Sequence, residues 1–355
     1  MEWSDYILLL KNKSKQSGTP LSATFELTPF CNFKCNMCYV RLTEKQALKQ
    51  GTPLTTEQWL NLAEEAKKSG TFHLEITGGE AITRQDFPIL YEAFIKMGYL
   101  INLRTNGYLI RGSLLELLSN YKPRKVSITL YGASDETYNT ICKSKDGFSV
   151  VTKNILALKQ AGIDAQVTVT LTTENYRDKE KLQEWADKNG LKITFFGGLF
   201  NPMRGVKRSI KHLRLDSNLL ENISIYRQNL NREIPDKDKY LHPFSMCTGY
   251  GTKYCITWDG RMTLCNCFPT IWSDPLKQSI SASYNDLYKQ LNQLHRPEKC
   301  LTCQYIDFCG NCPARFLSDT GNPEKTCDSI CAITYDSYKE WCLEHSQKEE
   351  RKTLI

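Results

Sequence analysis

The chain of 355 residues contains no run approaching the roughly 18 consecutive apolar residues that a membrane-spanning helix needs. Residues 7–10 are apolar, but this stretch is too short for a signal peptide, and lysines soon interrupt it. Internal repeats, low-complexity tracts and RNA-binding signatures are also missing. These absences argue against a membrane protein, a secreted protein and a nucleic-acid-binding protein, and they predict a cytoplasmic one.

Cysteine, in contrast, is abundant, with fifteen residues in a chain whose hydrophobic content of 41% is that of a globular protein. In a cytoplasmic chain this abundance indicates metal or redox chemistry rather than a framework of disulfides. The length predicts one large domain of about 200 residues with a smaller one appended.

Three of the cysteines, Cys31, Cys35 and Cys38, form a C-x3-C-x2-C triplet directly after the apolar segment 23–27. Three thiolates on one short loop can hold three irons of a [4Fe–4S] cube and leave the fourth iron open to another ligand. A structural zinc site would need four closed ligands, and no fourth Cys or His lies nearby in the sequence. The triplet therefore predicts a catalyst.

A second motif follows at residues 74–80, where a strand-like segment runs into Gly78, Gly79 and Glu80. Glycines allow close backbone approach, and a carboxylate can accept hydrogen bonds from an amino group. The triplet and this motif together resemble the radical S-adenosylmethionine (SAM) enzymes, although Met37 stands where the family often has an aromatic residue. The resemblance implies a [4Fe–4S] cluster whose open iron binds SAM. It also implies that SAM is cleaved to a 5′-deoxyadenosyl radical, which abstracts hydrogen from a substrate.

The first two hundred residues alternate between strand-like and helix-like segments, and a capping box at Thr55 and Gln58 opens one of the helices. Six β/α units with right-handed crossovers predict a parallel sheet curved into a partial (β/α)6 barrel similar to a TIM barrel. Its functional residues should meet at the carboxyl ends of the strands. The strands are expected at 23–27, 72–77, 100–105, 125–130, 165–171 and 192–196, and the helices at 56–69, 87–97, 112–120, 148–161 and 178–189.

The resemblance also suggests residues that contact SAM. These contacts would come from the strand ends and from the backbone of the residue after the triplet, and they comprise Tyr39, Thr77, Gly78, Gly79, Glu80, Asn106 and Thr129. Taken alone, Asn106 with Gly107 reads as a tight turn, and Thr129 reads as an ordinary strand residue.

The alternation of strands and helices stops at residues 197–246, where a polar helix is expected at 216–233. A basic stretch in this region is interpreted either as a solvated face or as a dock for an acidic substrate peptide. The stretch comprises Arg204, Lys207, Arg208, Lys211 and Arg214.

A second set of ten cysteines lies between residues 247 and 331, enough for two sites of four thiolates each. The order C-x12-G-x4-C, then C-x2-C-x5-C-x2-C, then a further cysteine resembles the SPASM extension of radical SAM enzymes, which usually has x3 before the fourth cysteine of the middle group. A zinc ribbon is the structural alternative. Its two C-x2-C pairs are normally separated by about 15 or more residues, whereas the pairs in this chain are separated by five.

By this resemblance, auxiliary cluster I uses Cys247, Cys265, Cys312 and either Cys255 or its competitor Cys267. Auxiliary cluster II uses Cys300, Cys303, Cys309 and Cys327, with Cys331 as the nearby alternative. Cys142 and Cys342 match no motif and are expected to be inert thiols. With three such clusters bound, the formal charge of +7 falls to roughly +2, which removes the case for a nucleic-acid partner.

SPASM proteins mostly modify peptides and proteins, so the sequence predicts an oxidoreductase that modifies a ribosomally made peptide by crosslinking, dehydrogenation or epimerisation. Sulfatase maturases carry a proton-accepting Asp where this chain has Asn266, which makes formylglycine formation less favoured. A small-molecule dehydrogenase, a haem-type tailoring enzyme and a non-catalytic Fe–S carrier or zinc scaffold are the alternatives.

About 22 residues precede the first strand, too few for a fused leader-binding domain, so a separate leader-recognition protein is expected. A flavodoxin- or ferredoxin-type protein is the expected electron donor. The expected division of the chain is an N-terminal segment at 1–22, the barrel at 23–200, a bridging region at 201–246, the SPASM domain at 247–335 and a tail at 336–355.

Overall fold

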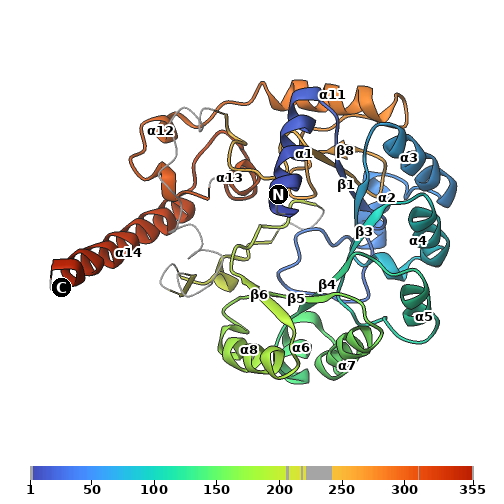
Figure 1. Cartoon of the computed structure of the whole chain (residues 1–355), viewed down its shortest axis with the longest axis horizontal. Helices are drawn as coiled ribbons and strands as arrows, with labels where there is room; N and C mark the ends of the chain where they lie inside the picture. Colours follow the sequence, from blue (N-terminus) through green and yellow to red (C-terminus); the bar gives the residue numbers. More distant parts are fainter. Residues whose placement is uncertain (1–2, 205–207, 217–218, 221–241, 311, 354–355) are drawn as a thin grey trace.

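The computed structural model describes residues 3–204, 208–216, 219–220, 242–310 and 312–353. Eight strands form one sheet in the order β6-β5-β4-β3-β2-β1-β7-β8, and the sheet is not closed. Strands β1 to β7 run parallel to their neighbours, and only β8 is antiparallel. Figure 1 shows the strands as an arc with helices along its outer side. The expected partial barrel of six parallel strands is confirmed, and two further strands extend it.

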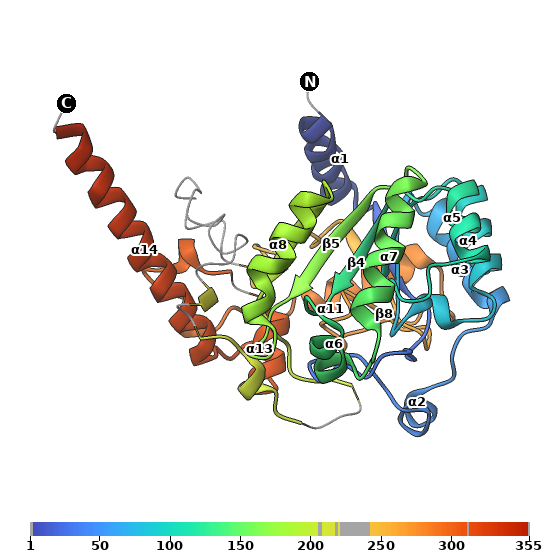
Figure 2. The ribbon, with the colours of Figure 1, turned by 90° about the horizontal axis from the view of Figure 1, so that it is seen from below.

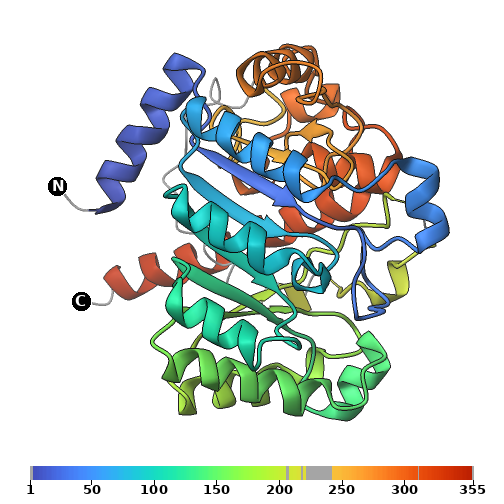
Figure 3. The same cartoon turned by 90° about the vertical axis from the view of Figure 1, so that its right-hand side faces the viewer.

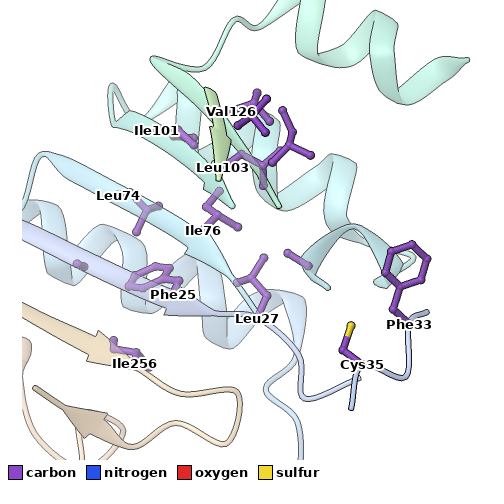
Figure 4. Close-up of a cluster of buried hydrophobic side chains, with 14 of the residues drawn as sticks. Phe25, Leu27, Phe33, Cys35, Leu74, Ile76, Ile101, Leu103, Val126 and Ile256 are labelled. Atoms are coloured by element: carbon purple, nitrogen blue, oxygen red, sulfur yellow. The ribbon is translucent and has the colours of Figure 1, made fainter. Parts of the chain in front are cut away.

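Strands β2, β4 and β5 alternate between buried apolar residues and half-buried polar ones, as in β4, where Val126, Ile128 and Leu130 are buried. Successive side chains of a strand point to opposite faces, so the apolar set packs under the helices and the polar set lines the inner face. Figure 4 shows part of this core around Phe25 and Ile76. The strands are β1 Ser22–Glu26, β2 His73–Thr77, β3 Leu100–Thr105, β4 Lys125–Leu130, β5 Ala165–Thr170 and β6 Lys192–Phe196.

The helices on the outer side of the arc are visible as a layer over the sheet in Figure 3. The expected capping box is confirmed at the start of α3, where the Thr55 hydroxyl accepts a hydrogen bond from the backbone N–H of Gln58, and Gln58 Oε1 accepts one from Thr55 N–H. The outer helices are α3 Thr56–Lys68, α4 Phe87–Lys96, α5 Ser113–Asn120, α7 Gly147–Gln160 and α8 Lys179–Lys188.

Three helices in the first half of the chain were not expected from the sequence. They are α1 Trp3–Ser17, α2 Glu44–Gln50 and α6 Asp135–Cys142. In Figure 2, α1 lies near one end of the barrel and α2 at the opposite end.

The cysteine-rich segment contributes directly to the barrel sheet. Its strand β7 Lys253–Ile256 pairs in parallel with β1, and β8 Met262–Thr263 pairs antiparallel with β7. The helices that follow are α11 Ile280–Leu291, α12 Glu298–Leu301, α13 Pro313–Thr320 and α14 Asp328–Thr353, which projects from the body of the molecule (Figure 2). No helix within the described residues is long and apolar enough to cross a membrane.

Candidate active site

The triplet Cys31, Cys35 and Cys38 lies on the loop that follows the carboxyl end of β1. Figure 4 shows Cys35 and Phe33 on this loop, beyond the end of the strand that carries Phe25. Cys35 is buried, whereas Cys31 and Cys38 are partly exposed. The three thiols are close enough for each to influence the ionisation of another. The loop therefore presents three thiols from one short segment at the carboxyl edge of the sheet, where functional residues of such folds gather.

The Gly-Gly-Glu motif lies directly against the start of the triplet loop. The backbone N–H of Gly79 donates to the Thr28 carbonyl at 2.6 Å, and that of Glu80 donates to the Phe30 carbonyl at 2.7 Å. A Cβ at Gly79 would lie 2.2 Å from the Phe30 carbonyl oxygen, and one at Gly78 would lie 2.8 Å from that of Thr28. Glycine is therefore required because two backbones touch here.

Gly79→Ala is expected to lower stability by about 1–3 kcal/mol or more, because the new methyl group would collide with backbone rather than with a movable side chain. The measurement is the melting temperature of the anaerobic protein. Gly310→Ala is the matched control, since a Cβ at Gly310 meets nothing within 4 Å. Equal melting temperatures for the two variants would contradict the close approach.

The carboxylate of Glu80 is held by the end of β3 and is only 2% exposed. Its Oε2 accepts from the Asn106 backbone N–H at 2.7 Å, and its Oε1 accepts from the Thr105 hydroxyl at 3.0 Å and from Ile82 N–H at 3.3 Å. Burial raises the pKa of Glu80 to about 7. Oε1 already accepts two hydrogen bonds, whereas Oε2 accepts one, so Oε2 can receive a further donor in this position.

Asn106 joins the Glu80 region to the triplet. Its amide Nδ2 donates to Asn32 Oδ1 at 2.8 Å and lies 3.7 Å from the Cys31 sulfur. Its Oδ1 accepts from the Tyr108 backbone N–H at 3.0 Å, as expected for a tight turn. Asn106 thus forms a turn and also contacts the triplet loop.

The other two suggested contacts, Thr129 and Tyr39, lie apart from Glu80. The Thr129 hydroxyl is 3.5 Å from that of Thr168, on the inner face of the sheet. The Tyr39 carbonyl accepts from the Met203 backbone N–H at 3.4 Å, and its ring packs on Phe200. Its hydroxyl is in hydrogen-bond contact with Cys267 of the second cysteine group. Tyr39 therefore connects the triplet loop with the cysteine-rich segment.

Helix α6 holds the triplet loop in place, and sequence reasoning missed this. The backbone N–H groups of Lys34 and Asn36 donate to the carbonyls of Cys142 and Ile141 at 2.9 Å, and the buried Cys142 thiol is in hydrogen-bond contact with Cys35. Free carbonyls at a helix carboxyl end are a usual partner for such a loop. The signals in the sequence were the N-cap residue Ser134, with acidic residues in the turn after it, and the otherwise unassigned Cys142.

The basic stretch turns inward over much of its length, so its interpretation as a solvated face is wrong for three of its arginines. Arg208 Nη2 donates to the Cys35 carbonyl at 3.3 Å, and its buried Nε has no partner within the described residues. Arg214 forms an ion pair with Asp319 of α13. Lys211 is exposed, and Lys207 and most of the helix expected at 216–233 lie outside the described residues.

Arg204 is the most deeply buried of these arginines. Its Nη1 contacts both carboxylate oxygens of Glu26, at 2.5 and 2.6 Å, and its Nη2 donates to the Asn266 carbonyl at 3.2 Å. Both side chains of the ion pair are almost fully buried, at the carboxyl end of β1. The pair fastens the segment after β6 and the cysteine-rich segment to the barrel, which leaves Arg204 unavailable for an acidic peptide.

The first group of auxiliary-region cysteines gathers near this ion pair. The thiols of Cys265 and Cys267 are in hydrogen-bond contact, and Cys312 lies close to Cys265 and Cys247. Cys255 is fully buried on β7, close to Cys265 and to Glu26. Cys255 therefore lies near Cys265, and its competitor Cys267 lies near Cys265 and Cys312.

The second group lies where α12 and the following turn meet the start of α14. A cavity of about 440 Å³ opens there, and thiols make up part of its wall. The thiols on the wall belong to Cys300, Cys303, Cys309 and Cys331.

In none of the three cysteine groups do at least three Cys, His, Asp or Glu side chains within the described residues converge on a single ion. A [4Fe–4S] cube asks for a different arrangement, because each thiolate binds its own iron at a separate corner. Three spaced thiols on the triplet loop, beside the buried and unpartnered Nε of Arg208, fit such a cube.

The comparisons with known proteins agree with this site. Residues 25–186 match the model of the Radical SAM superfamily. The antilisterial bacteriocin subtilosin biosynthesis protein AlbA of Bacillus subtilis is 28% identical over 332 residues, which cover 90% of this chain and 72% of AlbA. An AdoMet-dependent heme synthase of Methanosarcina barkeri is 24% identical over 86% of this chain and 95% of its own length.

Among solved structures, SuiB of Streptococcus suis bound to S-adenosylmethionine superposes with a TM-score of 0.68 at 17% identity, over 93% of this chain and 83% of SuiB. At this identity the likeness supports the fold alone, and it does so over almost the whole chain. The family match covers β1 to α8, the part that carries the triplet and Gly-Gly-Glu. The chain therefore contains a radical SAM domain, at residues 25–186.

Proposed function

We propose that the protein is a cytoplasmic radical SAM/SPASM oxidoreductase that modifies a ribosomally made peptide. The observation that carries this proposal is the contact between two motifs, because the backbone of Gly-Gly-Glu lies against the loop that presents three thiols. The similarity to AlbA, a bacteriocin biosynthesis protein, supports the proposal that the substrate is a peptide.

In this proposal Cys31, Cys35 and Cys38 hold three irons of a [4Fe–4S] cluster, and SAM takes the fourth iron. When bound, the cluster supplies the electron that cleaves SAM and so starts hydrogen-atom abstraction from the substrate. The protein's own contribution is placement. Hydrogen bonds from Lys34 and Asn36 to the end of α6 fix the loop, and burial keeps water away from Cys35.

Glu80 accepts a hydrogen bond from the amino group of SAM, and the backbone of Thr77, Gly78 and Gly79 lies beside the methionyl part. Asn106 bonds ribose or carboxylate oxygens from its position 3.7 Å from the Cys31 sulfur. Thr129, further along the inner face, and the backbone of Tyr39 complete the proposed contacts. These assignments rest on the positions described above together with the family resemblance.

The cysteine-rich segment holds two auxiliary [4Fe–4S] clusters in the proposal. The first uses Cys247, Cys265, Cys312 and Cys255 or Cys267. The second uses Cys300, Cys303, Cys309 and a fourth thiol from Cys327 or Cys331. A cluster near the substrate can accept the second electron that crosslinking or dehydrogenation releases. A flavodoxin- or ferredoxin-type protein donates the first electron, and a separate protein recognises the leader of the peptide.

The inner face of the sheet supports a polar, extended substrate. Polar side chains from neighbouring strands lie at equal heights along the register, as do Ser127 and Gln166, and Thr129 and Thr168. Hydroxyl and amide groups can bond a peptide backbone without selecting one side chain. SuiB, which has this fold, was also solved with its precursor peptide SuiA. The heme synthase relative makes a porphyrin the second candidate.

The test is mass spectrometry of peptides encoded beside the gene, after anaerobic reaction with SAM and dithionite. A loss of about two mass units per modification is expected for crosslinking or dehydrogenation. Unchanged mass with deuterium taken up from solvent would indicate epimerisation, which also fits the proposal. Turnover of a porphyrin with every peptide unchanged would overturn the peptide substrate. No release of 5′-deoxyadenosine under any reducing condition would overturn the radical reaction itself.

SAM affinity is expected to fall as the pH drops below about 7. The pKa of Glu80 is about 7 in the free protein, and a hydrogen bond from the amino group of SAM to the ionised carboxylate would lower it in the complex. The attraction is therefore complete above pH 7 and is lost as protons bind Glu80 below it. The measurement is the dissociation constant of SAM as a function of pH, by anaerobic equilibrium dialysis from about pH 5.5 to about pH 8.5.

Glu80→Gln is the matched variant, because it keeps the size of the side chain and removes the titration. It should bind SAM more weakly by about 1.5–3 kcal/mol above pH 7 and show a flat profile. A wild-type profile as flat as that of Glu80→Gln would exclude this role for Glu80.

A further inference from the structure

The segment from Cys300 to Cys309 is curled by successive backbone turns. Cys303 N–H donates to the Cys300 carbonyl at 3.4 Å, Ile306 N–H donates to the Cys303 carbonyl at 3.3 Å, and Cys309 N–H donates to the Ile306 carbonyl at 3.0 Å. Each turn brings the next cysteine back toward the previous one. All three of these cysteines line the cavity of about 440 Å³.

The fourth thiol on the wall of this cavity belongs to Cys331 and not to Cys327. Apolar and aromatic side chains surround the thiols, among them Ile306, Phe316 and Tyr335. Cys300 and Cys303 also lie close enough to Cys331 for mutual electrostatic influence. The cavity therefore has four thiols within a largely apolar enclosure.

The packing of α14 explains why Cys331 faces this cavity. Tyr335 and Tyr338 of α14 pack on Tyr305, with ring centroids 5.3 and 4.9 Å apart, and Tyr338 also packs on Phe308 at 5.3 Å. Residues i, i+4 and i+7 share one face of a helix. Cys331 lies four residues before Tyr335 and seven before Tyr338, so it is on the face that docks against the curled segment.

Cys327 precedes α14 and has other partners. It belongs to the same buried cluster as Cys309 and Phe316, but it does not line the cavity. Its sulfur lies 3.4 Å from the Ser329 hydroxyl, which donates to Asp319 Oδ2 at 3.3 Å. Asp319 is in turn bound by Arg214 Nη1 at 2.9 Å and by Asn201 Nδ2 at 3.0 Å. Cys327 therefore belongs to a polar network that ties the segment after β6 to α13 and the start of α14.

We propose that Cys331, together with Cys300, Cys303 and Cys309, ligates auxiliary cluster II, and that Cys327 is a positioning residue in the Asp319 network. This inference rests on the proposed function, because it assumes that the segment binds an iron–sulfur cluster. It reverses the choice that linear spacing suggested, in which Cys327 was the ligand. The two cysteines are one helical turn apart, so local orientation decides between them.

The test uses the full chain carrying Cys31→Ala, Cys35→Ala and Cys38→Ala, in which only auxiliary clusters remain. After anaerobic reconstitution this parent should hold about eight irons. Adding Cys331→Ala should leave about four irons, whereas adding Cys327→Ala should leave about eight. Iron loss on Cys327→Ala would overturn the assignment, whether or not Cys331→Ala also lost iron.

Serine variants keep the test decisive if an alanine variant fails to fold. Cys331→Ser leaves an oxygen ligand, so the reduced protein should show an altered electron paramagnetic resonance spectrum and a shifted midpoint potential. Cys327→Ser keeps a polar group beside the Ser329 hydroxyl and should leave both the spectrum and the potential unchanged. The opposite pattern would overturn the inference. A parent that binds stoichiometric zinc or no iron would instead overturn the auxiliary clusters of the proposed function, and this inference with them.

Discussion

Replacing Cys31, Cys35 and Cys38 together with alanine should lower the iron content from about twelve to about eight per chain and abolish release of 5′-deoxyadenosine. The reason is that these thiols hold the one cluster that SAM can reach, whereas the auxiliary thiols lie on other elements. Iron analysis and chromatography of the anaerobic reaction measure the two effects. This loss of activity is the largest effect expected of any substitution in the chain.

Cys142→Ala is the matched control for the triple variant. Cys142 is buried and its thiol contacts Cys35, yet it comes from α6 and belongs to no ligand motif. Iron content should stay at about twelve in this variant. Loss of four irons on Cys142→Ala, or an unchanged iron content in the triple variant, would refute the assignment of the triplet as the SAM-binding cluster site.

The barrel could be predicted from the sequence because local patterns set its elements. Strands such as β2 His73–Thr77 and β4 Lys125–Leu130 coincide with runs in which polar and apolar residues alternate. The proximity of the triplet and Glu80 followed from the same pattern, because parallel strands bring their carboxyl ends to one edge. The backbone of the Gly-Gly-Glu motif touches the start of the triplet loop, so both glycines are necessary there. The two consecutive glycines in the sequence had suggested such a close backbone approach.

Contacts between distant parts of the chain could not be predicted in this way. The parallel pairing of β7 with β1 joins segments more than two hundred residues apart, and the short strand Lys253–Ile256 carries no sign of its partner. Helix α6 was missed because its eight residues place only Tyr138, Ile141 and Cys142 on the buried face, and so short a pattern does not separate a helix from a loop in the sequence. The run of basic residues gave a wrong prediction for Arg204, because it carries no information about its buried partner Glu26, which lies 178 positions away in the sequence.

Arg204→Met should destabilise the protein by about 3–5 kcal/mol, because it leaves the Glu26 carboxylate buried without its partner. Glu26 is 1% exposed, so water cannot replace the guanidinium. The loss should appear as a fall of about 4–7 °C in the anaerobic melting temperature, since an unfolding entropy of about 2.1 cal/mol/K per residue gives about 1.3 °C per kcal/mol for 355 residues. Retention of SAM cleavage in the folded variant at low temperature would separate this structural role from a catalytic one.

Two further variants identify the buried charge as the cause. Arg104→Met removes the partner of Glu75 on a neighbouring strand, but the Arg104 side chain is 61% exposed, so the cost should stay below about 1 kcal/mol. The double variant Glu26→Leu with Arg204→Met replaces both charges with apolar groups and should recover most of the lost stability. If the double variant were as unstable as Arg204→Met alone, the cost would lie in lost packing or in the Asn266 carbonyl, which Arg204 also bonds. Recovery of stability in the double variant would show that the ion pair stabilises the fold near the triplet by neutralising the Glu26 carboxylate, which is buried at the end of β1.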